Sequence, residues 1–405
     1  MGCISSTRRM LRILSCVVVL SVFTAPFSLS APLQTPPSLQ LTIAGSATTV
    51  FDWSTMRCED WDVPDVPVRA WRGADQQIHV VASHFRNRMM KGSSLNQLQH
   101  DCSVVFEGNS QDNPALSDDR SWIAATHSTD GQTVYALVHN EFQGHSRPAL
   151  CPSARYMSCW RNSITLAISR DDGRTFTHAP PPAHYVAGVP YRYEGDAGHP
   201  TGYFAPSNIV ERDGYYYAFI WAEEVGAQQR GVCLMRTNDL EDRTSWRAWD
   251  GASFSVSFVD PYAADIHTPS DHVCTPVGNG RLGSFVASVV KHRPSGLYIA
   301  LLATTRPSSM DGKPVSGIYF ATSSDLISWS TPALLLDLPM QFDFACSDQA
   351  AYFYPSLLDP DSPSRNFDDA GDRADLYLTK IYLDKCKLSM RRDLVRIPVI
   401  IGVRH

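Results

Sequence analysis

An eight-residue segment, from Ser169 to Phe176, has the pattern Ser-x-Asp-x-Gly-x-Thr-aromatic. Asp and Gly suit a tight turn, because the short carboxylate accepts hydrogen bonds from the amides ahead of it and Gly tolerates positive φ. Looser versions of the segment recur about 70 to 90 residues apart. Their marker aspartates are Asp172, Asp239, Asp325 and Asp393. This recurrence predicts repeated β-modules in which the aromatic residue of each turn packs between sheets.

Between these turns, the chain repeats pairs of apolar strands joined by short polar turns, of which Asp130-Gly131 is the strongest hairpin signal. Helical periodicity is poor, and 24 Gly and 27 Pro disfavour long helices. The expected pairs are 66–71 with 78–83, 122–126 with 134–139, 207–210 with 215–221, 285–290 with 297–302, and 354–358 with 376–381. We therefore expect an all-β fold, a five-bladed β-propeller of four-stranded antiparallel blades, with a β-sandwich as the alternative.

Residues 1 to 30 have the features of a signal peptide. Arg8, Arg9 and Arg12 precede the apolar run 13–20, and small residues near Ala31 offer a cleavage site. Residues 31 to 57 form a lead-in whose strand, 39–43, would close the last blade. Residues 58 to 405 would form a single propeller domain. We expect a secreted or periplasmic protein with no membrane span after cleavage, and an uncleaved anchor is the alternative.

Export would remove Cys3 and Cys16 and leave eight cysteines, which favours disulfides in an oxidising compartment. Eight cysteines allow about a hundred connectivities, so the sequence leaves the pairing open. Sequential pairing would keep each link within one blade or its loop. No Cys-x-x-Cys zinc spacing is present in the sequence.

The formal net charge is −6, and the signal contains three of the arginines and no acid. The mature chain is therefore more acidic still, which argues against a nucleic-acid partner because phosphate binding needs a basic surface. We expect a monomer.

Propeller geometry brings residues that lie before the first strand or after the second strand of every blade to one rim. Applied to this chain, the rule collects acids, arginines and aromatic residues, the groups that a sugar site needs. The candidate catalytic residues are Asp65, Glu141, Glu223 and Asp119. The candidate substrate-binding residues are Arg69, Arg88, His139, Asn140, Tyr203, Arg306 and Tyr354.

Several of these residues have a plainer interpretation. Asp65 lies between prolines and suits a turn, Arg69 and Arg88 would serve equally to bridge blades, and only one of Glu223 and Glu224 is expected to point inward. The histidines lack the spacing of a metal pair, so no metal or cofactor is expected. A calcium ion at the channel centre remains an open alternative.

The segments Phe204-Ala205-Pro206 and Asp213-Gly214-Tyr215-Tyr216-Tyr217, with the turn Asp325 to Trp329, resemble five-bladed propeller glycosidases of the arabinanase and invertase type. The turn at Ser169 to Phe176 is similar to the Asp-box of sialidases. The resemblance implies a glycoside hydrolase fold in which Asp65 stands at the position of the base. The proton-donor motif of those enzymes is absent, because Tyr203-Phe204-Ala205-Pro206 stands in its place.

Two functions follow from this pattern. The leading hypothesis is an exported glycoside hydrolase, with Asp65 as base or nucleophile and Glu141 or Glu223 as acid. The alternative is a carbohydrate-binding or adhesive propeller without catalysis, which the missing donor motif favours.

Overall fold

The computed structural model describes residues 38–263, 265–308 and 310–404. The expected signal peptide and the first part of the lead-in lie outside these residues. The described chain is nearly all-β. Its only α-helix, α1 (Trp53–Met56), is one turn long and begins at Asp52, whose carboxylate accepts from Ser54 N at 2.9 Å. None of the described helices has the length and apolar character that crossing a membrane requires. Short 3₁₀ turns occupy Pro114–Leu116, Gly144–Ser146, Met157–Cys159, Arg243–Ser245, Pro269–His272 and Gly278–Gly280.

The first two groups of strands, which we call modules 1 and 2, are antiparallel and follow the chain from one neighbour to the next. Module 1 holds β3 (Arg69–Arg72), β4 (Ile78–Val81), β5 (Asn87–Gly92) and β6 (Leu98–Phe106). Module 2 holds β7 (Arg120–His127), β8 (Val134–Gln143), β9 (Trp160–Ser169) and β10 (Tyr185–Ala187). The strands β8 and β9 pair over ten residues, from Val134 opposite Ser169 to Gln143 opposite Trp160.

Module 3 is joined to module 2 by β11 (Thr201–Phe204), which pairs with β13 antiparallel and with β9 parallel. The two modules therefore form one ten-stranded sheet instead of two separate four-stranded ones. The other strands of module 3 are β12 (Val210–Arg212), β13 (Tyr215–Ala222), β14 (Gly231–Thr237), β15 (Arg247–Trp249) and β16 (Phe254–Ser257).

Modules 4 and 5 complete the described chain. Module 4 holds β17 (Ser288–His292), β18 (Tyr298–Pro307), β19 (Pro314–Ser323) and β20 (Ala333–Asp337). Module 5 holds β21 (Ala350–Leu358), β23 (Arg373–Asp384), β24 (Lys387–Arg404), β1 (Ser38–Ile43) and β2 (Thr48–Phe51). The insertion between β21 and β23 carries β22 (Asp369–Ala370), which pairs with β17 of module 4.

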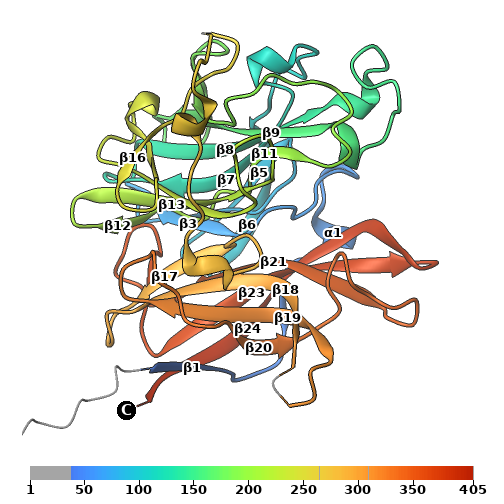
Figure 1. Cartoon of the computed structure of the whole chain (residues 1–405). Helices are drawn as coiled ribbons and strands as arrows, with labels where there is room; N and C mark the ends of the chain where they lie inside the picture. The colour runs from blue at the N-terminus through green and yellow to red at the C-terminus, as the bar shows by residue number, and fades with distance from the viewer. Residues whose placement is uncertain (1–37, 264, 309, 405) are drawn as a thin grey trace, which may run out of the picture. The chain divides into compact units, whose positions relative to one another are not determined.

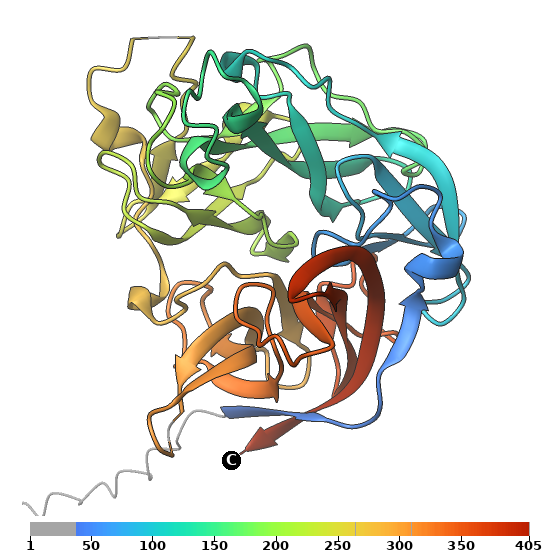
Figure 2. The same cartoon turned by 90° about the vertical axis from the view of Figure 1, so that its right-hand side faces the viewer.

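The strand expected at 39–43 is β1, and it pairs with β24 near the C-terminal end of the described chain. Figure 1 shows the two strands side by side at the edge of one sheet. In Figure 2 the colour passes around the molecule from the blue start of the described chain to the red end, and the two ends lie together.

The apolar core lies between modules instead of within them. Trp71 and Val81 of module 1 pack with Ile123 and Val138 of module 2, and the clusters between modules 2 and 3, 3 and 4, and 4 and 5 are built in the same way. A further cluster joins Tyr377 of module 5 to residues of module 1. Each module thus buries both faces against its neighbours, and the last module contacts the first. Because burial of apolar surface is the main force that stabilises a fold, no module is expected to be stable alone.

The Asp turn recurs after β9 of module 2, β14 of module 3 and β19 of module 4. Asp171 Oδ1 accepts from Thr175 N at 2.9 Å, Asp239 Oδ1 from Glu241 N at 2.9 Å, and Asp325 Oδ1 from Ser328 N at 2.7 Å. The aromatic residues that follow are buried: Phe176, Trp246 and Trp329.

Two of the expected turn markers are wrong. The carboxylate that caps the first turn is that of Asp171, not of Asp172. Asp393 lies within β24, because the expected turn at 391–395 continues as strand and pairs with β23.

The eight cysteines of the described chain form four disulfides in sequential order, the pairing that the sequence left open. They join Cys58 to Cys102, Cys151 to Cys159, Cys233 to Cys274, and Cys346 to Cys386.

Candidate functional site

A cavity of about 340 Å³ is lined by residues from all five modules. Its titratable side chains are three carboxylates, a histidine, an arginine and a tyrosine: Asp65, Glu141, Glu223, His139, Arg230 and Tyr354. Asp65 lies just before β3, His139 and Glu141 lie near the end of β8, and Glu223 directly follows β13. Arg230 precedes β14, and Tyr354 lies within β21. The expected convergence of these segments therefore brings together five of the eleven predicted site residues.

Asp65 lies at the entrance to module 1, where its backbone N–H donates to Ala82 O at 3.0 Å. Its Oδ1 forms an ion pair with Arg392 from β24, and its Oδ2 lies 3.4 Å from His84 Nε2. The Tyr354 hydroxyl donates to the same Oδ1 at 3.5 Å. The carboxylate thus carries a cation on one oxygen and an imidazole on the other.

Glu141 has a different environment. Its Oε2 accepts from Gln143 Nε2 at 2.9 Å, and its Oε1 lies 3.4 Å from His139 Nε2. His139 Nδ1 accepts from the Ala205 N–H at 3.1 Å, and its Nε2 also contacts the side-chain amide of Asn162. No Lys or Arg of the described residues forms an ion pair with Glu141.

Glu223 follows β13 and is held by two groups. Its Oε1 accepts from Trp221 Nε1 at 2.8 Å, and its Oε2 is 3.1 Å from Arg230 Nε. The Arg230 guanidinium also lies over the Trp221 ring, 5.4 Å from its centroid, while its side chain stays 64% exposed. Glu224 is exposed, so only one acid of this pair points inward, as expected.

The apolar part of the lining is aromatic. Trp122, Trp160, Phe204, Trp221 and Phe353 contribute to it, and Tyr156 stacks on Trp160 with centroids 5.0 Å apart. Flat rings of this kind bind the apolar faces of sugar rings, while the carboxylates and Arg230 supply the hydrogen bonds that hydroxyls need.

Two cavity residues have positive φ although they are not glycine: Ala205 at 46° and Tyr354 at 55°. Each precedes a proline, which makes helical conformations still less favourable. Strain of this kind persists only where the surrounding structure holds it. Here it directs the Ala205 N–H at His139 and the Tyr354 hydroxyl at Asp65.

Two groups beside Asp65 have perturbed acidities. Desolvation raises the pKa of Tyr354 well above its usual range, and the charges of Asp65 and Glu141 add to the rise. Burial lowers the pKa of His84, and Arg392 acts in the same direction. Tyr354 therefore keeps its proton and remains a donor toward Asp65.

Arg69, a predicted sugar ligand, lies beneath the cavity and does not line it. Its guanidinium donates to three carbonyl oxygens from modules 2, 3 and 4: Ala124 at 2.6 Å, Pro206 at 3.1 Å and Ala287 at 2.9 Å. Burial lowers the pKa of Arg69 to about 9, so the charge is retained at neutral pH. These contacts fit the interpretation in which Arg69 links neighbouring modules.

The other predicted residues that do not line the cavity have structural partners. Arg88 pairs with Glu59, Tyr203 donates to Gln228, Asp119 accepts from Arg147 and Gln143 N, Asn140 donates to Ser121, and Arg306 donates to Leu282 O beside the cavity wall. These contacts place Arg88, Tyr203, Asp119 and Asn140 in buried networks.

The sequence interpretation missed Arg392 and Arg230. Arg392 was assigned to a turn that does not form, which concealed its place on β24 opposite Ile381. Arg230 lies in the hairpin between β13 and β14, on the rim where the second strand ends. Extending the rim rule to that hairpin would have found it.

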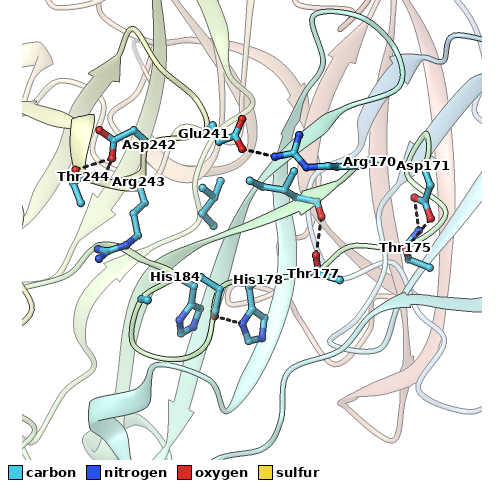
Figure 3. Close-up of a pocket in the computed structure, with 14 residues that line it drawn as sticks. Arg170, Asp171, Thr175, Thr177, His178, His184, Glu241, Asp242, Arg243 and Thr244 are labelled. Carbon is cyan, nitrogen blue, oxygen red and sulfur yellow. Dashed lines mark hydrogen bonds and ion pairs between the residues drawn. The ribbon is translucent and has the colours of Figure 1, made fainter.

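A second hollow, of about 660 Å³, is lined by β9, by the segment that follows it and by residues 241–244 between β14 and β15 (Figure 3). As in the first cavity, its acids have partners: Asp171 with Thr175, Asp242 with Thr244, and Glu241 with Arg170. It has no aromatic wall apart from His178 and His184. The smaller cavity is therefore the stronger candidate.

Comparison with known proteins gives likenesses of structure alone. No family model and no curated protein matches the chain. Among solved structures, the α-L-arabinanase of Cellvibrio cellulosa is 10% identical, with 82% of this chain and 91% of that chain covered and a TM-score of 0.45. The catalytic domain of the GH62 α-L-arabinofuranosidase of Coprinopsis cinerea is 9% identical, with 88% and 97% covered and a TM-score of 0.47. An N-acetylgalactosamine deacetylase from F. plautii is 12% identical, with 90% and 95% covered and a TM-score of 0.43. Because these activities differ and the similarity is low, none is transferred to this chain.

Proposed function

We propose that the five modules are the blades of a five-bladed β-propeller with Asp-box-like turns, and that the protein is a glycoside hydrolase. The observation that carries the proposal is the meeting of Asp65, Glu141 and Glu223, from three different modules, in one cavity with an aromatic wall. Glycoside hydrolysis needs two carboxyl groups in unequal environments on either side of the scissile bond. The substrate would be a polysaccharide or oligosaccharide.

The surroundings of the acids support a division of roles. Asp65 forms an ion pair with the Arg392 cation, an arrangement that suits a base or nucleophile. Glu141 is contacted by His139 and Gln143 and forms no ion pair with a Lys or Arg of the described residues, which suits the acid that protonates the leaving oxygen. Glu223, held by Trp221 and Arg230, would position a sugar hydroxyl or act as the acid in place of Glu141.

The proposal includes export. Four disulfides stabilise a chain that folds in an oxidising compartment, and the expected signal peptide would direct it there. We propose that the secreted protein is a monomer.

The test is a screen of purified protein against aryl glycosides and plant, microbial and host polysaccharides. We expect turnover that falls by roughly 10²- to 10⁴-fold in Glu141→Gln and by at least as much in Asp65→Asn. Glu241→Gln, in the second hollow, is the matched control and should keep full activity. Glycan binding without turnover, unchanged in both cavity variants, would overturn the proposal and establish a binding propeller instead.

A further inference from the structure

Three side chains of types that bind metal ions lie close together at the contact between modules 1 and 2, and none of them lines the cavity. His79 is on β4, Asp75 is in the hairpin before it, and Asp172 is in the turn that follows β9. His79 Nε2 is 3.3 Å from Asp172 Oδ2 and 3.9 Å from Asp75 Oδ1. One ligand atom from each residue lies within 4.8 Å of the other two.

The two inner members of this group are buried and form an ion pair, but three of their polar atoms have no hydrogen bond. His79 is 1% exposed and neither of its ring nitrogens is hydrogen-bonded, while Asp172 is 8% exposed and its Oδ1 has no hydrogen bond. Most buried polar groups in proteins are hydrogen-bonded, because an unpaired one costs free energy. The unsatisfied hydrogen-bonding capacity beside this ion pair indicates that a further component is missing.

The backbone leaves space between the His79 and Asp172 side chains and Gly73. Gly73 faces it, and a Cβ there would lie 2.5 and 2.8 Å from the Asp172 oxygens and 2.8 Å from His79 Nε2. Asp172 has a φ of 65°, although Asp171 is the residue that caps the turn. A strained, non-capping aspartate is explained if its carboxylate is needed at this point.

We propose that His79, Asp172 and Asp75 bind a zinc ion that links module 1 to the Asp turn of module 2. A mixed set of one imidazole and two carboxylates suits zinc, with water as the fourth ligand. In a tetrahedral site with bonds of about 2.0 to 2.1 Å, neighbouring ligand atoms are about 3.3 Å apart. The separation of His79 Nε2 from Asp172 Oδ2 already matches this edge.

Asp75 completes the site by a small movement. Its side chain is 40% exposed, and its Oδ2 pairs with Lys91 Nζ at 2.7 Å. A zinc ion replaces the lysine as the partner of this carboxylate, and Lys91, itself 35% exposed, turns to solvent. A closing of about 0.5 Å between Asp75 and His79 reaches the tetrahedral spacing.

The experiment uses the purified full chain after treatment with a chelator and dialysis. Zinc chloride is returned, and retained metal and the midpoint of thermal unfolding are measured. Cobalt chloride serves as a second probe, because tetrahedral Co²⁺ absorbs visible light and reports its ligands without any mutation. We expect one retained equivalent, an unfolding midpoint several degrees higher, and a tetrahedral cobalt spectrum.

Variants assign the ligands. His79→Gln and Asp172→Asn should lose retention and the thermal shift, and Asp75→Asn, at an exposed position, should weaken zinc binding by about tenfold or more. His100→Gln is the matched control, because His100 pairs with Asp62 at 2.7 Å in the same module, and the nearby Cys58 is held in a disulfide. It should retain zinc like the wild type.

The inference is overturned if the wild-type chain retains no zinc and gives no tetrahedral cobalt spectrum. It is equally overturned if His79→Gln and Asp172→Asn fold and retain as much zinc as the wild type. Neither result bears on the proposed hydrolase, because none of the three ligands lines its cavity.

Discussion

Arg392 and Asp65 form an ion pair across 327 residues of sequence, with one partner on the last strand and the other at the entrance to module 1. Both side chains are 15% exposed, so water screens the pair only partly. The ion pair therefore connects the last strand of the chain to a carboxylate that lines the cavity.

Arg392→Gln removes the cation and leaves Asp65 with His84 and Tyr354 as neighbours. Because Arg392 holds one oxygen of this carboxylate, its loss should disturb the position of Asp65 in the cavity. We expect hydrolytic activity to fall. Steady-state kinetics of the variant and the wild type measures the change in kcat/KM. An unchanged kcat/KM in Arg392→Gln would separate Arg392 from the reaction.

Arg69 is expected to be a determinant of stability. Arg69→Met leaves the carbonyls of Ala124, Pro206 and Ala287 without their donor in a buried place. We expect the free energy of unfolding to fall by about 3 kcal/mol or more. Arg170→Met, which removes an exposed pair with Glu241, should cost less than about 1 kcal/mol. Urea unfolding measures both, and equal losses would refute the bridging role.

His127 is expected to make folding sensitive to acid. Burial lowers its pKa to about 4 from an ordinary value of 6.5. Between these pH values the histidine is protonated in the unfolded chain but not in the folded chain. The free energy of unfolding is therefore highest above pH 6.5 and falls as the pH approaches 4. The loss amounts to about 3 kcal/mol.

In His127→Gln this part of the pH dependence should disappear. The measurement is the difference in unfolding free energy between about pH 7 and about pH 4.5, which cancels any constant cost of the substitution. His199→Gln, at an exposed position, should keep the wild-type difference. A wild-type difference retained in His127→Gln would show that other groups cause the acid sensitivity.

The four disulfides are expected to differ in how much they stabilise the fold. The Cys58–Cys102 link closes 44 residues and the Cys151–Cys159 link only 8. Loop-closure entropy predicts a cost of about 4 kcal/mol for removing the first and about 2.5 kcal/mol for removing the second. Double Cys→Ala variants of each pair, compared by guanidinium unfolding, measure this order. The reverse order would show that contacts within the folded loops outweigh the entropy of loop closure.

The strands and their pairing in hairpins were predictable from the sequence. The apolar runs at 122–126 and 134–139 became β7 and β8, and the Asp-Gly turn joined them as expected. Such features depend on neighbours in the chain, on alternation along a strand and on the conformational freedom of turn residues. The same local rule, applied to each hairpin, brought Asp65, Glu141 and Glu223 to one cavity.

The β-hairpins with polar ends and the four potential cysteine links could be predicted from the sequence, because those properties belong to short segments. The three-dimensional packing was needed to establish that Arg69 bonds to carbonyls, that Tyr203 is buried, that Arg392 contacts Asp65, and which cysteines join. The orientation of a buried charged side chain depends on the group that compensates its loss of hydration. Here that group comes from another module, far away along the chain, so no local sequence pattern predicts it.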